Sequence, residues 1–306
     1  MMRLMEYLNE QDRSVPVSEL ADLARREFEV SEVTLRSDLS ALARLHGIRK
    51  LARGTYEAAR DGVPEGLGGG SLFTTRLQHR AQSKIAIAGA VAEVLRAQAD
   101  LRVLLLDAGT TTYYLADHLS ERAGLDLIVW TPSIAAAERL AGARGISVRL
   151  LGGELRADYA VVAGDETARA LRSLAGPSAN GGSGALPQFP GAHSVLDINY
   201  LSSEGCLLTD ESNERLQKRL MAELGEDLTI VADHSKLFGR RLGLQAHEVS
   251  ALHELAGKRT LRLVTDAGAS EAQQAELRDC LGGLVGRELA VEQRGEAILY
   301  TSRRAD

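Results

Sequence analysis

The sequence predicts an α/β protein in two parts, a small and mainly helical amino-terminal domain and a large domain with a mostly parallel sheet. Two observations predict this. Short β-branched or Leu-rich runs alternate with longer helical patterns from residue 75 onward, which is typical of βαβ units. Gly and Pro crowd together over residues 57–71, where neither a helix nor a strand is expected. We therefore place an amino-terminal domain at 1–60, a linker at 61–71 and the large domain at 72–306.

The composition is that of an ordinary globular protein. Of the 306 residues, 44% are hydrophobic and 25% are charged, so disorder is a poor interpretation. The two Cys lie far apart, which gives no support to a disulfide framework or a zinc site. The first residues lack the pattern of a secretion leader, and no apolar run is long enough to span a membrane. We expect a cytoplasmic protein with no cofactor, no metal and no membrane partner.

Charge is distributed unevenly along the chain. The net charge of −6 arises entirely after residue 60, because the first sixty residues carry ten basic and ten acidic groups. Residues 33–56 hold Arg36, Arg44, Arg49, Lys50 and Arg53 against a single acidic residue. This local basic patch is typical of a surface that binds nucleic acid.

Three helices are predicted in the first sixty residues. Leu4 and Leu8 mark the first, Ser18 is the expected N-cap of the second, and Ser31 is that of the third. In the third helix Leu35, Leu39 and Leu42 share one buried stripe. The opposite side carries Val33, Ser37, Ser40 and Arg44, and Thr34 and Arg36 lie on its flanks. Their hydroxyls and arginines suit base edges and phosphates, and the β-branched apolar Val33 suits a thymine methyl group.

A hairpin is predicted to follow the third helix. HGIRKLARGTYEA, residues 46–58, contains a short strand, a basic turn at Arg53 and Gly54, and a return strand. Together these elements predict a winged helix-turn-helix, with Arg49, Lys50 and Arg53 added to the DNA-binding set. The alternative is a three-helix cap or dimerisation module whose arginines only face water.

The elements of the large domain follow from the same alternation. Strands are expected at 102–107, 126–131, 146–151, 194–198, 227–233 and 260–266, and ELAVEQ and AILYT add two edge strands. Helices are expected at 75–98, 112–122, 134–143, 211–224 and 271–281. Residues 175–193 contain five Gly and three Pro, which predicts a surface loop or a disordered insertion.

LLLDAGTTTYYLADHL, residues 104–119, is the most informative segment of the large domain. A buried strand ends at Asp107, the chain turns at Gly109, and a helix opens with Thr110, Thr111 and Thr112. Free backbone N–H groups and Thr hydroxyls at a helix N-terminus can hold a phosphate or a carboxylate. This loop also lies at the carboxyl ends of the strands, where ligands bind in open α/β sheets. The alternative is a capped turn without a ligand.

VSELADL and VSEVTLRSDLSALARLHGIRK resemble the amino-terminal domain of DeoR-type transcriptional repressors. Thr34, Leu35, Arg36, Asp38 and Leu39 match the core of the family motif. The chain departs from the motif at Ser37, where the family usually has a second Arg, and in the wing, where ARGTY replaces a His-Gly-Gly. In the large domain, FTTRLQHRAQSKIAIAGAVAEVL resembles the family's entry helix through Arg76 and Lys84.

Further segments extend the resemblance to near Asp266. They are TPSIAAAERL, in which Pro132 replaces the family's Asn, LLGGELRADYAVVAGDE, LSSEGCLLTDESNERLQKRLM with Lys218 in its helix, and VADHSKLFG. The resemblance implies an effector site made by Asp107, Gly109, Thr110, Thr111, Thr112, Thr131, Gly152, Gly153, Glu204, Gly205 and Lys236.

The function that the resemblance implies is a repressor that binds double-stranded operator DNA and is released by a phosphorylated sugar. A dimer or tetramer is expected, because one helix-turn-helix binds DNA weakly. Trp130, placed on the pocket side, is expected to report ligand binding by its fluorescence. A ligand-independent DNA-binding protein is one alternative.

A sugar-phosphate isomerase is the other alternative, because the family's sensor domain is related in fold to ribose-5-phosphate isomerases. Asp197, Glu204 and Lys236 would be its remnants. The isomerase motifs Asp-Gly-Ala-Asp-Glu and Lys-Gly-Gly-Gly are absent from the chain, however, and no carboxylate pair suited to proton transfer is recognisable. We therefore predict a protein that is not an enzyme and has no catalytic residues.

Overall fold

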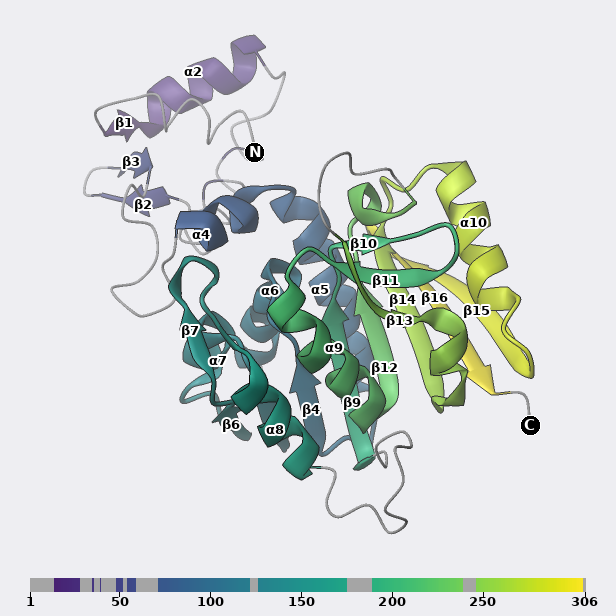
Figure 1. Cartoon of the computed structure of the whole chain (residues 1–306). Coiled ribbons are helices and arrows are strands. Elements are labelled where there is room, and N and C mark those ends of the chain that lie inside the picture. Colours follow the sequence, from purple (N-terminus) through teal and green to yellow (C-terminus); the bar gives the residue numbers. More distant parts are fainter. Residues whose placement is uncertain are drawn as a thin grey trace. The chain divides into compact units, whose positions relative to one another are not determined.

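The structure is a computed structural model that describes residues 14–27, 35, 39, 48–51, 54–58, 71–121, 126–174, 189–238 and 246–304. The chain divides into two compact units, Met1–Gln78 and His79–Asp306. Figure 1 labels their helices and strands.

The described part of the first unit contains a small antiparallel sheet and helices. Its elements are β1 (Val15–Pro16), α2 (Val17–Glu27), β2 (Ile48–Lys50), β3 (Thr55–Ala58) and α4 (Ser71–Gln78), and the strands lie in the order β1-β3-β2. The predicted hairpin is present as β2 and β3, with Gly54 in the left-handed region at φ 72°. Ser18 is not the N-cap of the second helix, because α2 begins at Val17 and Ser18 is its second residue.

Four leucines of the first unit are buried as the helical stripes predict. Leu20 and Leu23 are buried in α2, and Leu35 and Leu39 are buried one helical turn apart, each at 7% exposure or less. Of the predicted DNA contacts, Arg49 and Lys50 lie in β2. The others lie outside the described residues: Val33, Thr34, Arg36, Ser37, Ser40, Arg44 and Arg53.

One large sheet forms the centre of the second unit. Its strands are β4 (Val103–Leu106), β5 (Leu127–Thr131), β6 (Ile146–Leu150), β9 (Phe189–Asp197), β12 (Gly225–Val231), β14 (Thr260–Asp266), β15 (Arg287–Arg294) and β16 (Ala297–Arg304). Within the described residues these eight strands lie in the order β15-β16-β14-β12-β9-β4-β5-β6. All neighbouring pairs from β14 to β6 are parallel, and β16 pairs antiparallel with β14 and β15. The predicted mostly parallel sheet with two added edge strands is confirmed.

Helices cover both faces of this sheet. Helices α5 (Ala81–Arg96), α6 (Thr110–Ser120) and α7 (Ile134–Leu140) pack on one face, and α8 (Asp165–Leu174), α9 (Ser212–Leu224) and α10 (Glu271–Gly282) pack on the other (Figure 1). Because both faces are covered, apolar side chains of the central strands are buried on either side, as in Leu104, Leu105 and Leu106, which are at most 2% exposed. The layered packing leaves the strand ends as the place where polar side chains can gather.

The predicted single helix over 75–98 is wrong. The chain forms α4 and α5 instead, with a two-residue turn at His79 and Arg80 between them. Arg80 has φ 54° and ψ 39°, in the left-handed region, and this conformation ends the helical hydrogen-bond ladder. No Gly or Pro stands at the turn, so composition carries no signal of the break.

The start of β9 also corrects the prediction. Residues 189–193 were assigned to the Gly/Pro-rich insertion, but they form the first half of the strand, and the remainder of that insertion, 175–188, lies outside the described residues. Gly191 makes this possible with φ 68° and a close approach to Asp100, where an added Cβ would lie 2.7 Å from the carbonyl oxygen. The breakers Pro190 and Gly191 therefore mark an irregular strand rather than a loop.

Smaller elements of the second unit were not predicted. They are helix α8, the hairpin of β7 (Glu154–Arg156) and β8 (Val161–Ala163), the sheet of β10 (Tyr200–Leu201), β11 (Cys206–Thr209) and β13 (His247–Ala251), and the short helices η2 (Ala157–Tyr159), η3 (His234–Lys236) and η4 (Leu252–Gly257). Their strands are too short for the alternation of apolar and polar residues to be visible.

Candidate functional site

Four aspartates lie at the carboxyl ends of four adjacent parallel strands. Asp107 directly follows β4, Asp197 ends β9, Asp233 follows β12 by two residues, and Asp266 ends β14. Since the carboxyl ends of parallel strands share one edge of the sheet, these side chains form a row across it. All four are at most 5% exposed, so each carboxylate needs partners in place of water.

Lys218 is the partner of the first aspartate in the row. Its Nζ lies 2.6 Å from Asp107 Oδ2, 2.9 Å from the carbonyl oxygen of Asp197 and 3.6 Å from Glu214 Oε2. Burial alone would lower the pKa of Lys218, but the nearby Asp107 and Glu214 carboxylates outweigh burial and raise it. The ammonium is therefore charged, and it fixes the end of β4 to the end of β9.

The second aspartate lies at the N-terminus of α6. Asp197 Oδ2 accepts the backbone N–H of Thr111 at 3.2 Å, and its Oδ1 accepts the Lys236 ammonium at 2.5 Å. Its own backbone N–H donates to Asp107 Oδ2 at 3.1 Å. Gly109 is required here, because an added Cβ would lie 2.2 Å from Asp197 Oδ2. The helix N-terminus that was predicted to hold an anion thus holds a carboxylate of the chain itself.

Two polar atoms at this position lack a partner. Asp107 Oδ1 and Thr111 Oγ1 are buried and have no hydrogen bond within the described part of the chain. A buried polar atom without a partner costs about 1–3 kcal/mol. Such atoms are uncommon in native proteins, and these two lie beside the ion pairs of Lys218 and Lys236.

The other two aspartates are linked by His234 and Arg80. His234 Nδ1 lies 2.7 Å from Asp266 Oδ2, and Arg80 donates to His234 Nε2 at 2.7 Å. The same carboxylate oxygen of Asp266 accepts the Ser83 hydroxyl at 3.0 Å. Burial alone would raise the pKa of Asp233, but Lys236 and hydrogen bonds from the next turn outweigh it and lower that pKa. Both carboxylates are therefore ionised and held by cations or donors.

The predicted threonines have different environments. Thr110, Thr111 and Thr112 are all buried in the first turn of α6, but the Thr112 hydroxyl donates to the carbonyl of Gly109 at 3.0 Å. Thr131 ends β5 and accepts the backbone N–H of Ser133 at 3.0 Å. Two of these hydroxyls therefore hold their own turns, and Thr111 is the one whose hydroxyl remains without a partner.

Four further predicted residues lie on turns away from Asp107 and Asp197. Gly152 and Gly153 follow β6 and pack against α8, where an added Cβ on Gly153 would lie 2.2 Å from Thr167 Oγ1. Glu204 and Gly205 form the turn between β10 and β11, and Gly205 accepts the backbone N–H of Leu252 at 2.9 Å. The described contacts thus bring together Asp107, Gly109, Thr111 and Lys236 from the predicted effector set.

Lys218, Asp233, Asp266 and Arg80 were absent from the predicted set, as was Asp197, which was weighed only as an enzyme remnant. A signal existed for two of these residues. Asp197 is a charged residue at the end of an apolar strand, and Lys218 lies on the buried side of α9 together with Met221 and Ala222. A charge on an apolar face has to be paired inside the protein, which is a reason to expect a site there.

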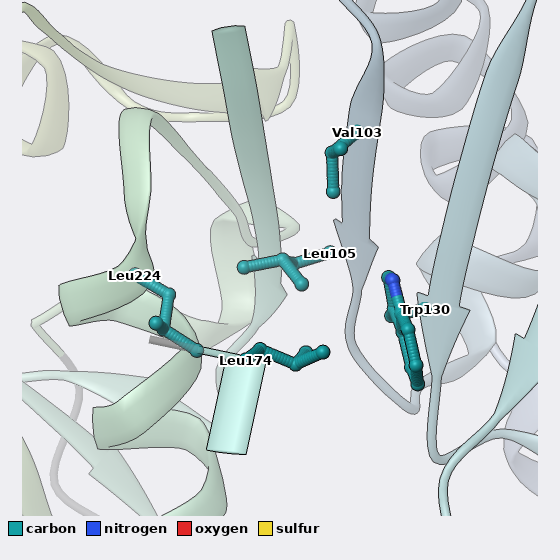
Figure 2. A pocket seen from close by; sticks show the side chains of 5 residues that line it. All are labelled: Val103, Leu105, Trp130, Leu174 and Leu224. Atoms are coloured by element: carbon teal, nitrogen blue, oxygen red, sulfur yellow. The ribbon is translucent and has the colours of Figure 1, made fainter. Parts of the chain in front are cut away.

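Two hollows are lined by described residues of the second unit. Val103, Leu105, Trp130, Leu174 and Leu224 line an apolar cavity (Figure 2). Trp130, expected on the pocket side, faces this cavity and not the aspartate row. The second hollow lies between α5 and the loop after β14, with Ser83, Asp266 and Glu296 in its wall.

Within the described residues, no three His, Cys, Asp or Glu side chains are grouped so that they could hold a metal ion. No helix in the described ranges combines the length and apolar character that crossing a membrane requires.

Comparisons with known proteins identify the second unit. The family model described as the DeoR C terminal sensor domain matches residues 79–257, more than half of the chain. An uncharacterised HTH-type transcriptional regulator of Bacillus subtilis, YulB, is 28% identical over 282 residues, which cover 90% of this chain and 92% of the relative. The glycerol-3-phosphate regulon repressor of Haemophilus influenzae is 29% identical over 228 residues, covering 74% of this chain and 78% of the relative.

Solved structures add little to these matches. Ribose 5 phosphate isomerase A from Neisseria gonorrhoeae is 15% identical, with a TM-score of 0.32 over 76% of this chain and 79% of that chain. We draw nothing from so low a score. The family model and the curated relatives agree, and the chain belongs to the DeoR family of transcriptional regulators.

Proposed function

We propose that the protein is a DNA-binding repressor that a phosphorylated sugar or a related metabolite releases from its operator. Membership of the DeoR family supports the regulatory role, and the names of two relatives support the ligand class. One is a glycerol-3-phosphate regulon repressor and the other a putative aga operon transcriptional repressor of Escherichia coli O157:H7. All of these relatives are regulators and not enzymes, which supports a function without catalysis.

The ligand site that we propose lies at the N-terminus of α6. The observation that carries it is the pair of buried atoms without partners, Asp107 Oδ1 and Thr111 Oγ1, beside the cations of Lys218 and Lys236. The ligand's phosphate would take the place of the Asp197 carboxylate on Lys236 and on the Thr111 N–H. Sugar hydroxyls would supply the missing partners of the two buried oxygens.

Operator binding is proposed for residues 1–60 as a winged helix-turn-helix. The β2–β3 hairpin, the buried Leu35 and Leu39 and the basic patch of residues 33–56 support this arrangement. Arg36 and Arg44 are the proposed base or phosphate contacts of the third helix. A homo-oligomer would present two such modules to two half-sites.

Release from DNA would follow from linkage between the two sites. A ligand shifts the protein toward the state that it binds better, by no more than its differential affinity for the two states. The same coupling factor then applies in both directions, so operator DNA would weaken ligand binding as much as the ligand weakens DNA binding.

The test is a fluorescence-anisotropy titration of the full chain against DNA from upstream of its own gene at several salt concentrations. Glycerol 3-phosphate, ribose 5-phosphate, fructose 6-phosphate and inorganic phosphate are added in turn. We expect selective DNA binding with a steep salt dependence, and relief by one of the sugar phosphates. Selective binding that none of them relieves would contradict the proposed ligand class.

Two variants locate the site. Lys236→Met should abolish relief while DNA binding persists, because it removes the cation proposed for the phosphate. Glu204→Gln is the comparison, since Glu204 is an exposed residue of the β10–β11 turn. An unchanged response in Lys236→Met together with a lost response in Glu204→Gln would move the site to that turn.

A further inference from the structure

Arg80 has a left-handed backbone conformation and lies close to the boundary between the two compact units. It is the second residue of the turn between α4 and α5, directly after the boundary at which the first compact unit ends. Its φ of 54° and ψ of 39° are left-handed, a conformation that a Cβ disfavours. No side chain caps the α5 N-terminus at this position. Something other than local preference must therefore hold this turn.

The Arg80 guanidinium is held by two groups at the carboxyl edge of the sheet. It donates to His234 Nε2 at 2.7 Å, and its Nε lies 3.7 Å from Asp233 Oδ1. That Nε is buried and makes no hydrogen bond within the described residues. Contacts at the strand ends thus fix a side chain whose backbone sets the entry of the chain into α5.

The His234 ring is itself fixed. Since an Arg N–H can only donate, Nε2 accepts and the ring proton is on Nδ1, which donates to Asp266 Oδ2 at 2.7 Å. The backbone N–H of His234 donates to the other oxygen of Asp266 at 2.8 Å. The ring also packs on Gly268, where an added Cβ would lie 2.6 Å from it. The ring cannot turn away from Arg80 without breaking these contacts.

The same short helix carries the proposed phosphate ligand. Helix η3 spans His234–Lys236, so Lys236 lies two residues from the ring that holds Arg80. Asp233 caps η3 by accepting the backbone N–H of Ser235 at 3.1 Å, and it also faces Arg80. Lys236 and both partners of Arg80 therefore belong to one short segment, residues 233–236.

We propose that Arg80 is the residue that couples the ligand site to the turn at the boundary of the two units, through η3. This rests on the proposed function, because it requires a ligand at Lys236. Arg80 is a positioning residue: it makes no proposed contact with the ligand or with DNA. When η3 shifts, the guanidinium loses its partners and the turn is free to leave the left-handed conformation.

The experiment measures coupling in the full chain. Arg80→Gly removes the side chain and tolerates the left-handed backbone, whereas Arg80→Ala removes the side chain and disfavours it. Arg139→Ala is the control, because Arg139 has nearly the same side-chain exposure, 32% against 33%, and pairs with one carboxylate, Asp117. The affinity for DNA is measured with and without glycerol 3-phosphate, or ribose or fructose phosphate where those relieve the wild type. The affinity for the same compound is measured by calorimetry with and without DNA.

In the wild type and in Arg139→Ala we expect the ligand to change DNA affinity by a factor of about 5–150, the usual range of allosteric coupling. In Arg80→Gly and Arg80→Ala the ligand should still bind within about threefold of wild type, while the coupling factor falls to near one in both directions. A merely structural role would lower stability and leave the coupling factor unchanged.

Full coupling in Arg80→Gly would overturn the inference while leaving the proposed function intact. Loss of ligand binding in the Arg80 variants would overturn it too, since Arg80 would then belong to the binding site. A wild type that no compound relieves would contradict the proposed ligand class and this inference with it.

Discussion

The two ends of the large sheet use similar side chains but pair them differently. At the amino end, His193 lies 2.8 Å from both Gln98 Oε1 and Thr229 Oγ1, Gln98 donates to Asp227, and Arg259 holds both oxygens of Asp227. At the carboxyl end, the aspartate row includes an oxygen, Asp107 Oδ1, without a partner. Both ends are buried and charged, so burial and charge alone do not mark a binding site. The unsatisfied oxygen distinguishes the carboxyl end, and it is the reason for placing the proposed ligand site there.

The comparison predicts that the two ends of the sheet have different roles, which mutations can test. Substitutions at the amino end should change stability and leave the ligand response intact. Substitutions at the carboxyl end should affect the ligand response, and the most buried of them should affect stability as well.

The largest effect is expected for Lys218→Met. Asp107 is fully buried and Lys218 is its cation at 2.6 Å, so the variant leaves a buried carboxylate without its cation. Breaking such a pair from one side lowers the free energy of unfolding by about 3–5 kcal/mol. Urea denaturation measures the loss, with Arg219→Met as control, since Arg219 is an exposed neighbour on the same helix. A loss equal to that of the control would show that the Lys218–Asp107 ion pair makes no special contribution to the free energy of unfolding.

A smaller effect is expected at the amino end on acidification. Burial lowers the pKa of His193 from 6.5 to about 3. Between these values the unfolded chain binds a proton that the folded protein does not, so the free energy of unfolding falls as the pH falls. From pH 6.5 to 4.5 the loss is about 2.3 kcal/mol.

His193→Gln should remove this component. The measurement is the difference in unfolding free energy between wild type and variant at the two pH values, with the exposed His253→Gln as control. If the difference is the same at both pH values, the lowered pKa of His193 is contradicted.

The smallest effect is expected for Lys258 at alkaline pH. Its Nζ donates to the carbonyls of Glu223 and Gly225, both at 2.6 Å, and burial lowers its pKa to about 8, against the attraction of Glu223 and Asp227. Above pH 8 the folded protein releases this proton while the unfolded chain keeps it to about 10.5, so the free energy of unfolding rises with pH.

Between pH 8 and 9.5 the rise from Lys258 is about 1.6 kcal/mol. Wild type should therefore gain this amount relative to Lys258→Met over the same interval, with DNA release by ligand unaffected. If the free energies of unfolding of the two proteins change in parallel with pH, the lowered pKa of Lys258 is contradicted. If Lys258→Met alters the ligand response, the expectation that only the carboxyl end affects that response is wrong.

The sheet was predictable because its strands are short Leu-rich or β-branched runs between helical patterns, as in residues 102–107 and 260–266. The turn at Arg80 was not, because its left-handed backbone is held by His234 and Asp233, which lie far away in the sequence. The short strands β7, β8 and β10 were missed because two or three residues show no periodicity.

For the candidate site, local sequence located the loop of Asp107, Gly109 and Thr111 but not its occupant. A strand end followed by Gly and Thr is a local pattern, whereas the placement of Asp197 at the α6 N-terminus depends on β9 pairing beside β4. The second cation, Lys218, belongs to a helix on the opposite face of the sheet. Contacts of this kind arise from topology, which a single sequence indicates only through the order of its elements.

The central position of β9 also sets the order in which the domain can assemble. The strands β14, β15 and β16 follow one another closely in the chain and can pair early, whereas β9 must find β4 across the long segment that holds β5 to β8. Closing such long loops costs chain entropy and is slow. We therefore expect β9 to insert late, and Asp197 to reach Asp107 and α6 only then. A newly synthesised chain would then acquire the proposed ligand site late in folding, and a ligand that binds there would favour completion of that step.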